Sequence, residues 1–289
     1  MPPEVSIGMP VYNGARFLRA TLDNLLAQTF SDFELIISDN ASTDETETIC
    51  RAYAEKDRRI RYIRQPENMG ATFNWNYVAQ MATGRFLKWS SSNDLCDPTL
   101  IEKCVAALQA DASAVLAYPR TILMDDNGVQ QGKYEKDLEI LEPTPSERFG
   151  RVATGMALNN AMCGLIRLEV LRKTRGERAY PAGDMVMMAE LALHGGFKLV
   201  PEYLFFRRVD QASTAKFLSK EKLAHFIKPK GGGMGMPNWR KYGDYYRSLV
   251  RTPIGMRERL RAMLAVTRWM IWERRTLLAE FAELFGIGR

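Results

Sequence analysis

Short apolar runs alternate with segments of helical spacing through the first 120 residues. A buried strand is predicted at Val5–Val11, and further strands are predicted at Phe33–Ser38, Ile60–Arg64, Phe86–Trp89 and Ala114–Tyr118. Between them, apolar residues at helical spacing predict helices at Arg16–Gln28, from Ser42–Glu45 to about Asp57, at Thr72–Met81 and at Pro98–Ala110. This alternation predicts an α/β fold with a mostly parallel, Rossmann-like sheet flanked by helices.

The pattern changes after residue 119. An Asn127-Gly128 turn between Thr121–Asp126 and Val129–Tyr134 predicts a β-hairpin. Further strands are expected at Cys163–Arg167, Phe197–Val200 and Leu204–Arg208, with a helix at Asp184–Leu193. Residues 228–238, rich in glycine, predict a flexible linker, and residues 239–289 predict a helical tail.

The charge of the chain is unevenly distributed. The 289 residues carry a formal net charge of +6, but residues 1–227 are close to neutral and most of the surplus falls in residues 228–275. Four cysteines without a CxxC pair, and only two histidines, argue against a structural zinc site and a disulfide framework. We expect no signal peptide and no spanning helix, hence a cytoplasmic protein, peripheral on the inner membrane face if the basic tail binds lipid.

Polar side chains follow the predicted strands, where ligands bind in parallel sheets. Asp39 ends the second strand and is expected to accept a hydrogen bond from a ligand such as a pyrimidine base; the alternative is a helix cap. Asn93 and Asp94 follow the fourth strand. Asp94 is a candidate ligand for Mg²⁺ or Mn²⁺ bound to phosphates, while the alternative is a solvated turn.

Three residues of the second half are further candidates. Asp184 opens a predicted helix, where it would be either a cap or a general base. Arg207 and Arg208 end a predicted strand, and guanidinium groups there would clamp phosphates, unless they are simply solvated or paired with acids.

Several blocks, in this order, resemble the family 2 glycosyltransferases, which have the GT-A fold. They are residues 5–14 with a PxYN turn, residues 33–44 with a D-x-S-x-D-like loop, Asn68-Met69-Gly70 with Asn76, Ala82 and Gly84, and residues 93–98 with an acidic motif before Asp-Pro. The ordered set covers about residues 4–120. A weaker match through Gly183-Asp184, Glu190 and Arg207-Arg208 extends to about residue 215.

The resemblance implies an inverting transfer of a sugar from a nucleotide diphosphate, commonly UDP, to a glycan or lipid-linked hydroxyl. Residues 1–227 would form the GT-A domain, with a nucleotide-sugar half at 1–120 and an acceptor half at 121–227. Tyr12 would lie against the base and Asp39 would bind the uracil edge. Asp94 would hold the metal and Asp184 would take the acceptor proton. The donor site would be completed by Pro10, Asn13, Asn68, Asn93, Arg207 and Arg208.

Two departures from the family pattern concern the metal. The family usually has two adjacent acids where this chain has Asn93 before Asp94, so metal affinity would be lower. The family often has a histidine after the basic strand end, where this chain has Val209 and Asp210. Asp210 is either a substitute metal ligand or a turn residue.

The partner of the helical tail and the competing functions remain open. Apolar residues from Leu260 recur at helical spacing beside a row of arginines, with Trp269 and Trp272 assigned to the polar side. This favours an anionic membrane surface as partner; the alternative is packing on the catalytic domain or on a second subunit. The sequence shows no nucleic-acid motif. A catalytically silent nucleotide-sugar binder and a nucleotidyltransferase are the competing functions, and an oligomer is possible.

Overall fold

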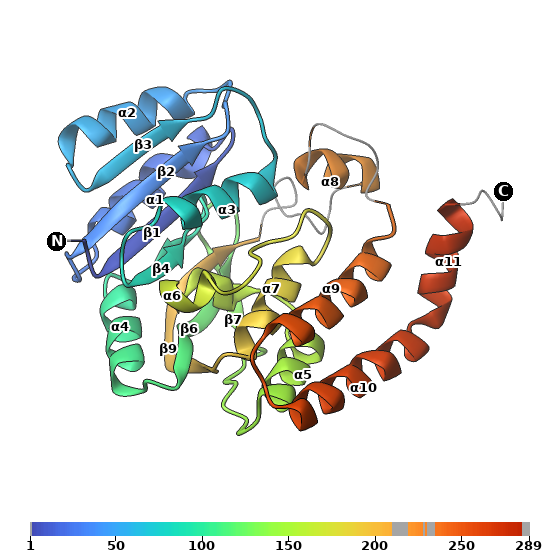
Figure 1. Cartoon of the computed structure of the whole chain (residues 1–289). Coiled ribbons are helices and arrows are strands. Elements are labelled where there is room, and N and C mark those ends of the chain that lie inside the picture. Colours follow the sequence, from blue (N-terminus) through green and yellow to red (C-terminus); the bar gives the residue numbers. More distant parts are fainter. Residues whose placement is uncertain (1, 210–218, 228, 230–234, 285–289) are drawn as a thin grey trace.

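The structure is a computed structural model that describes residues 2–209, 219–227, 229 and 235–284 (Figure 1). Its strands form one sheet in the order β3-β2-β1-β4-β8-β6-β9-β5, with β7 paired to β6. The strands are β1 (Val5–Val11), β2 (Phe33–Asp39), β3 (Ile60–Arg64), β4 (Phe86–Trp89), β5 (Leu95–Cys96), β6 (Ala114–Met124), β7 (Gln130–Tyr134), β8 (Leu165–Arg167) and β9 (Gly196–Arg208).

The first half of the sheet is parallel, as predicted. β1 pairs in parallel with β2 on one side and with β4 on the other, and β3 pairs in parallel with β2. The second and third strands therefore lie on one side of β1, and the chain then crosses to the other side of β1 to form β4. Such a switch in strand order leaves a crevice at the carboxyl ends of the strands. In the register of β1 and β2, Val11 lies opposite Asp39 at this edge.

Helices cover both faces of the sheet (Figure 1). They are α1 (Ala15–Leu26), α2 (Thr46–Lys56), α3 (Ala71–Met81), α4 (Leu100–Ala110), α5 (Pro145–Gly155), η1 (Asn160–Cys163), α6 (Leu168–Leu171), α7 (Gly183–Ala192), α8 (Lys220–Ile227), α9 (Pro237–Arg251), α10 (Met256–Trp272) and α11 (Arg274–Leu284). Along β1, alternate residues such as Val5 and Ile7 enter a core with α1, α2 and α4. A second core joins α3, α5, α7, α9 and α10.

In two places, two strands that were predicted separately form one long strand. The segments predicted on either side of Pro119 form β6, and those on either side of Pro201 form β9. The pairing of β6 with β9 shifts register next to Pro119. Proline lacks an N–H donor and is tolerated at such bulges. The elements β5, α5, α6 and α8 were not predicted. β5 and α6 have only 2 and 4 residues, whereas α5 begins with a capping box at Thr144 and a proline, two helix-start signals that were not used.

The tail packs on the rest of the chain through one side. Tyr242, Tyr245 and Leu249 of α9 are buried in the second core. Trp269 of α10 stacks on Phe149 of α5, with ring centroids 6.2 Å apart. The assignment of Trp269 to a polar side was therefore wrong, because helix α5 provides an apolar neighbour that the tail sequence does not reveal.

The predicted linker also ends earlier than expected. Helix α9 begins at Pro237, so the last two residues of the predicted 228–238 linker are helical. Proline is well suited to a first helical position. Residues 228 and 230–234 of that segment lie outside the described residues. No helix in the described ranges is both long and apolar enough to cross a membrane.

Candidate active site

The loops that follow β1 and β2 are held together by hydrogen bonds. The backbone N–H of Asn13 donates to Ser42 Oγ at 2.9 Å, and the N–H of Thr43 donates to Asn13 Oδ1 at 2.8 Å. Asn13 has a positive φ of 51°, a conformation that asparagine tolerates better than most residues. Tyr12, just before it, is 47% exposed, so its ring is available to a ligand.

Asp44, on the second of these loops, has a structural role. Its Oδ2 accepts from the N–H of Ala15 at 3.0 Å and its Oδ1 accepts from Thr46 at the start of α2. Burial acts to raise the pKa of Asp44, but the hydrogen bonds from Thr46 and Ala15 outweigh it and lower the pKa. Of the two acids in the D-x-S-x-D-like loop, Asp44 thus stabilises the conformation of the loop.

Asp39 lies at the end of β2 and is fully buried. Its Oδ1 accepts from the N–H of Ser42 at 2.8 Å, while its Oδ2 accepts from Tyr62 Oη at 2.8 Å and Arg64 Nη1 at 2.7 Å. Both partners come from β3. A buried carboxylate needs such a counter-charge. Tyr62 and Arg64 were missed by the sequence reasoning, although a polar-ended strand beside the predicted site was a usable signal.

Asn68 shapes the entry to α3. Its Oδ1 accepts from Asn40 Nδ2 at 2.8 Å and from the N–H of Gly70 at 2.9 Å. Asn40 Oδ1 in turn accepts from the N–H of Met69 at 2.9 Å. Gly70 has a φ of 89°, which a side chain would strain. The N-x-G block therefore fixes the loop after β3 against the loop after β2.

Asp94 lies between the end of β4 and the end of β9. Its Oδ1 accepts from the backbone N–H of Arg208 at 2.8 Å. Burial raises the pKa of Asp94, although that hydrogen bond and the charge of Arg207 act in the opposite direction. The buried ammonium of Lys88 also lies within electrostatic reach. Lys88, a charge inside the apolar run of β4, was a signal that the sequence reasoning did not use.

The two arginines at the end of β9 differ in what they bind. Arg208 is 7% exposed; its guanidinium donates to the carbonyls of Asn93 and Asp125 and lies over the ring of Phe17. Arg207 Nη1 donates to Asn160 Oδ1 at 2.7 Å. Arg208 thus holds the Asn93–Asp94 loop, which makes Arg207 the better candidate for a phosphate.

Asp184 does not cap its own helix. The structure gives α7 no side-chain cap, and Ala182 occupies the N-cap position with a positive φ of 66°. Asp184 Oδ2 instead accepts from Asn159 Nδ2 at 2.9 Å. Gly183 has room for no side chain, because an added Cβ would lie 1.9 Å from the carbonyl oxygen of Arg178. The tight turn therefore sets where Asp184 stands.

A continuous series of contacts joins Asp94 to Asp184. Asp94 binds the backbone of Arg208, and the neighbouring Arg207 binds Asn160. Asn159, next in the chain, binds Asp184. Asn159 and Asn160 were missed, because an Asn-Asn pair in a loop carries no distinctive sequence signal. The structure thus brings together the ends of β4 and β9, the start of η1 and the start of α7.

The donor set near Asp94 suits a hard cation that phosphate also binds. Among the described residues, no three His, Cys, Asp or Glu side chains gather as a metal cluster. Asp94 contributes one carboxylate, of which Oδ2 is not used by Arg208. Mg²⁺ is commonly held by one or two carboxylates together with substrate phosphates and water, which fits this set. Asp210, the other proposed ligand, lies outside the described residues.

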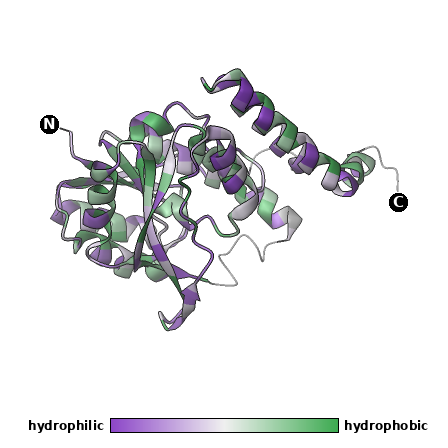
Figure 2. Cartoon of the chain, turned by 90° about the horizontal axis from the view of Figure 1, so that it is seen from below, coloured by the Kyte–Doolittle hydropathy of each residue, from purple (hydrophilic) through white to green (hydrophobic). Residues whose placement is uncertain are grey.

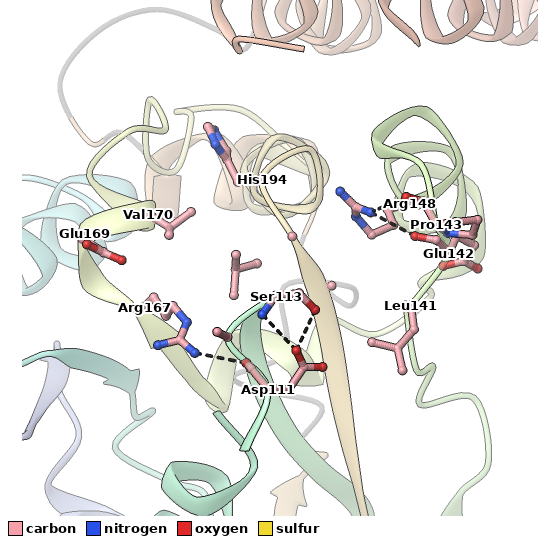
Figure 3. A pocket seen from close by; sticks show the side chains of 14 residues that line it. Asp111, Ser113, Leu141, Glu142, Pro143, Arg148, Arg167, Glu169, Val170 and His194 are labelled. Atoms are coloured by element: carbon pink, nitrogen blue, oxygen red, sulfur yellow. Dashed lines mark hydrogen bonds between the residues drawn. The ribbon is translucent and has the colours of Figure 1, made fainter. Parts of the chain in front are cut away.

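A cavity of about 620 Å³ lies elsewhere (Figure 3). Its lining includes Ser113 and Gly196, at the opposite end of β6 and β9 from Arg207. Arg148 and Arg167 point toward this cavity, yet both already donate to backbone carbonyls, of Glu142 and Asp111 respectively. None of the predicted site residues lines it, so it is separate from the site described above.

Comparison with known proteins gives a consistent family signal. The family model described as "Glycosyl transferase family 2" matches residues 6–175. An uncharacterized glycosyltransferase of Rickettsia typhi is 38% identical over 165 residues, which is 57% of this chain and 48% of the relative. Glycosyltransferase GlyG of Streptococcus pneumoniae is 30% identical over 202 residues, covering 70% of this chain and 67% of GlyG. The chain spans about half the length, or less, of the first relatives it matches.

Solved structures resemble the fold over almost the whole chain. Residues 1–349 of S. aureus TarS, in complex with UDP-GlcNAc, align with a TM-score of 0.68 at 14% identity, covering 97% of this chain and 80% of that one. The mannosyltransferase PcManGT of Pyrobaculum calidifontis, in complex with GDP-Man and Mn²⁺, aligns with a TM-score of 0.59 at 16% identity. The alignment covers 100% of this chain and 77% of PcManGT. At these identities the likeness concerns the fold.

Proposed function

Because the chain belongs to glycosyl transferase family 2, with the GT-A-type α/β fold expected for it, we propose that it transfers a sugar from a UDP-sugar to a hydroxyl group with inversion at the anomeric carbon. The acceptor would be a glycan or a lipid-linked glycan. Support for a nucleotide-sugar donor comes from the relatives in fold, whose complexes hold UDP-GlcNAc and GDP-Man. We propose uridine as the nucleoside of the donor because the carboxylate of Asp39 would accept a hydrogen bond from the uracil edge.

The donor would bind along the carboxyl ends of β1, β2 and β4. Tyr12 would cover the base, and Asp39, oriented by Arg64 and Tyr62, would accept the N–H of the uracil edge. Pro10, Asn13 and Asn68 would shape this part of the site through the backbone and the loop contacts described above. Arg207 would contact the diphosphate, with Asn93 and Arg208 holding the loop that carries Asp94.

Asp94 would hold Mg²⁺ or Mn²⁺, and the metal's charge would stabilise the departing diphosphate. Asp210 remains a proposed second ligand. Asp184 would accept the proton of the acceptor hydroxyl while the hydroxyl oxygen bonds to the anomeric carbon. The bond from that carbon to the diphosphate oxygen breaks with its electron pair on the diphosphate. Attack from the face opposite the leaving group inverts the centre.

The observation that carries this proposal is the contact series from Asp94 through Arg207 and Asn160 to Asn159 and Asp184. It links a carboxylate suited to the metal–diphosphate with one suited to the acceptor. The test is UDP release from UDP-sugars with Mn²⁺, with and without glycan acceptors. Asp94→Ala and Asp184→Asn should each abolish transfer, while Asp184→Asn still binds UDP. UDP binding without turnover under every acceptor would favour a silent binder instead.

We propose further that the outer side of α10 lies on an anionic membrane. Leu260, Leu264 and Ile271 are each more than half exposed there. Beside them on the helical wheel, Arg257, Arg261 and Arg268 form an exposed basic row. Figure 2 shows hydrophobic and hydrophilic residues side by side along the helices that end at the C-terminus. The inner side, with Ala262 and Val266, is buried against the domain.

Vesicle sedimentation tests this surface. Wild type should bind phosphatidylglycerol vesicles and not phosphatidylcholine vesicles. Reversal of the basic row, as Arg257→Glu, Arg261→Glu and Arg268→Glu, should weaken binding on the order of a hundredfold, at roughly 1 kcal/mol per basic residue. The matched control reverses three exposed charges at the other end of the molecule, as Lys56→Glu, Arg58→Glu and Arg61→Glu. Equal loss in both variants, or dimerisation through α10, would argue against a membrane partner.

A further inference from the structure

A second cavity, of about 280 Å³, opens where the tail meets the loop before α7. Its lining comes from three parts of the chain: Thr72 of α3, the loop residues 177–180, and Arg240, Asp244 and Arg247 of α9. Asn76 of α3 fixes that loop, because its side chain both donates to the carbonyl of Glu177 and accepts from the N–H of Glu177, each at 2.9 Å. The cavity is therefore built by the tail and the catalytic domain together.

Positive charge dominates the cavity. Arg178, Arg240 and Arg247 line it. Arg178 and Arg247 both pair with the buried carboxylate of Asp244, at 3.4 Å and 3.0 Å. That carboxylate is shared, since Arg175 Nη1 binds it at 2.8 Å and Tyr180 Oη donates to it at 2.6 Å. The Arg247 side chain is 69% exposed and that of Arg178 is 40% exposed, so both can turn toward a ligand.

Glu177 is the other acid of the cavity. Its Oε2 is buried and has no hydrogen-bond partner among the described residues. Burial, and secondarily the charge of Asp184, raise the pKa of Glu177 to about 8. Near neutral pH the group is therefore mostly a neutral acid, which can donate a hydrogen bond to an anion. An unpartnered buried oxygen is costly, and a bound ligand would satisfy it.

The cavity lies beside the proposed base. Glu177 and Asp184 are close enough for their charges to interact, and Tyr180 is separated from Asp184 only by a short turn. We propose that this cavity binds a phosphate group of the acceptor, placing a nearby hydroxyl at Asp184. The inference rests on the proposed transferase function and deepens it, because it assigns the acceptor to the phosphate-bearing class. Guanidinium groups are well suited to phosphate oxygens.

The experiment is a calorimetric titration of the full chain with inorganic phosphate, with and without saturating UDP. UDP occupies the donor's diphosphate site, so binding that persists belongs to a second site. Wild type should bind phosphate in both conditions. The double variant Arg178→Gln with Arg247→Gln should bind at least about tenfold more weakly, since it loses two charge-assisted contacts. Glutamine keeps donors for Asp244, and the unfolding temperature checks that the fold is retained.

Two further variants serve as controls. Arg251→Gln with Arg257→Gln removes the same charge from exposed tail positions outside the cavity and should leave phosphate binding unchanged. Glu177→Gln keeps an N–H donor and removes the ionisable group, so it should bind phosphate at least as well as wild type. Loss of binding in Glu177→Gln, equal loss in the Arg251 and Arg257 control, or no phosphate binding in the presence of UDP would overturn the proposal.

The source of the phosphate is separated by competition. A soluble phosphodiester, glycerophosphoglycerol, and a polyprenyl diphosphate in detergent are each tested against bound phosphate. Displacement by either supports the proposal and identifies a polymer or a lipid carrier as the acceptor class, whereas displacement by neither contradicts it. UDP binding is measured in the same titrations. Its failure would count against the donor assignment and leave the cavity result to stand independently.

Discussion

Asn159 donates from Nδ2 to Oδ2 of Asp184 at 2.9 Å, and this bond, made across 25 residues, sets the orientation of the proposed base. The bond leaves Oδ1 of Asp184 available for the proposed acceptor hydroxyl. Asn159 itself is a positioning residue, because it acts on the acceptor through Asp184. The next residue, Asn160, accepts a hydrogen bond from Arg207, so one short segment orients both the proposed base and the proposed phosphate contact.

Replacing Asn159 should affect turnover more than donor binding. Asn159→Ala frees the Asp184 side chain, and a misplaced catalytic group costs on the order of a hundredfold in rate. We expect kcat to fall 10- to 100-fold, with the KM for the donor changed less than about threefold. Asn159→Asp would set two carboxylates side by side; because like charges so close resist ionising together, its activity should move to higher pH. An unchanged kcat and pH profile in both variants would remove Asn159 from the mechanism.

Asn93 offers a gain-of-affinity test for the metal. Asn93→Asp restores a second acid beside Asp94, so Mn²⁺ should bind about tenfold more tightly in the presence of UDP, which is roughly 1.4 kcal/mol. Titration calorimetry with and without UDP measures this. In wild type, removal of the metal with EDTA should abolish transfer, and Mn²⁺ should restore it. Equal Mn²⁺ affinity in Asn93→Asp and wild type would indicate that residue 93 points away from the metal.

Arg64 is expected to control donor affinity through Asp39. Its guanidinium makes a 2.7 Å ion pair with the fully buried carboxylate of Asp39. Arg64→Met leaves that carboxylate without its counter-charge, and breaking a buried pair costs roughly 3–5 kcal/mol. Because this pair is partly exposed on the arginine side, we expect a smaller loss of stability than for a fully buried pair, together with at least about tenfold weaker UDP binding. Arg61→Met, exposed on the same strand, is the control.

Asp244 should matter most for stability. Its carboxylate binds Arg175 Nη1 at 2.8 Å and Tyr180 Oη at 2.6 Å, and both partners belong to the loop before α7. Asp244→Asn removes the charge and leaves the buried Arg175 with a weaker partner, Glu190, at 3.7 Å. We expect a loss of about 3 kcal/mol in the free energy of unfolding at pH 7, measured by urea denaturation. A change below 0.5 kcal/mol would mean that the pair does not hold the tail.

The same residue gives a pH dependence whose sign follows from its pKa. Burial acts to raise the pKa of Asp244, but hydrogen bonds from Tyr180, Arg175 and Arg247 outweigh it and lower the pKa from 3.8 to about 2. A lowered folded-state pKa stabilises the protein above the unfolded value, and this contribution is lost as the pH falls. The difference in stability between wild type and Asp244→Asn should therefore shrink between pH 4 and pH 2. A constant difference across that range would argue against the assignment.

The local pattern of the chain was enough for the first half of the fold. The apolar run Val5–Val11 has the bounds that the structure gives it, because burial on both faces of a parallel strand requires a continuous apolar run. Ile60–Arg64 also has the predicted bounds, although β3 is a partly exposed edge strand. The strand ends then located Asp39 and Asp94 at the carboxyl edge of the sheet. Residues beyond 120 were harder, since prolines in β6 and β9 interrupt the local signal while long-range pairing maintains the strands.

What the sequence determined by itself is thus the family, the alternating architecture and the acids at strand ends, all of which depend on residues close together in the chain. Tertiary structure alone decided which groups hold those acids: Arg64 for Asp39, the backbone of Arg208 for Asp94 and Asn159 for Asp184. It also decided that the basic tail has two sides, one packed on α5 and α7 and one exposed. Contacts between residues 25 to 114 positions apart depend on how whole elements pack, and no local pattern records that packing.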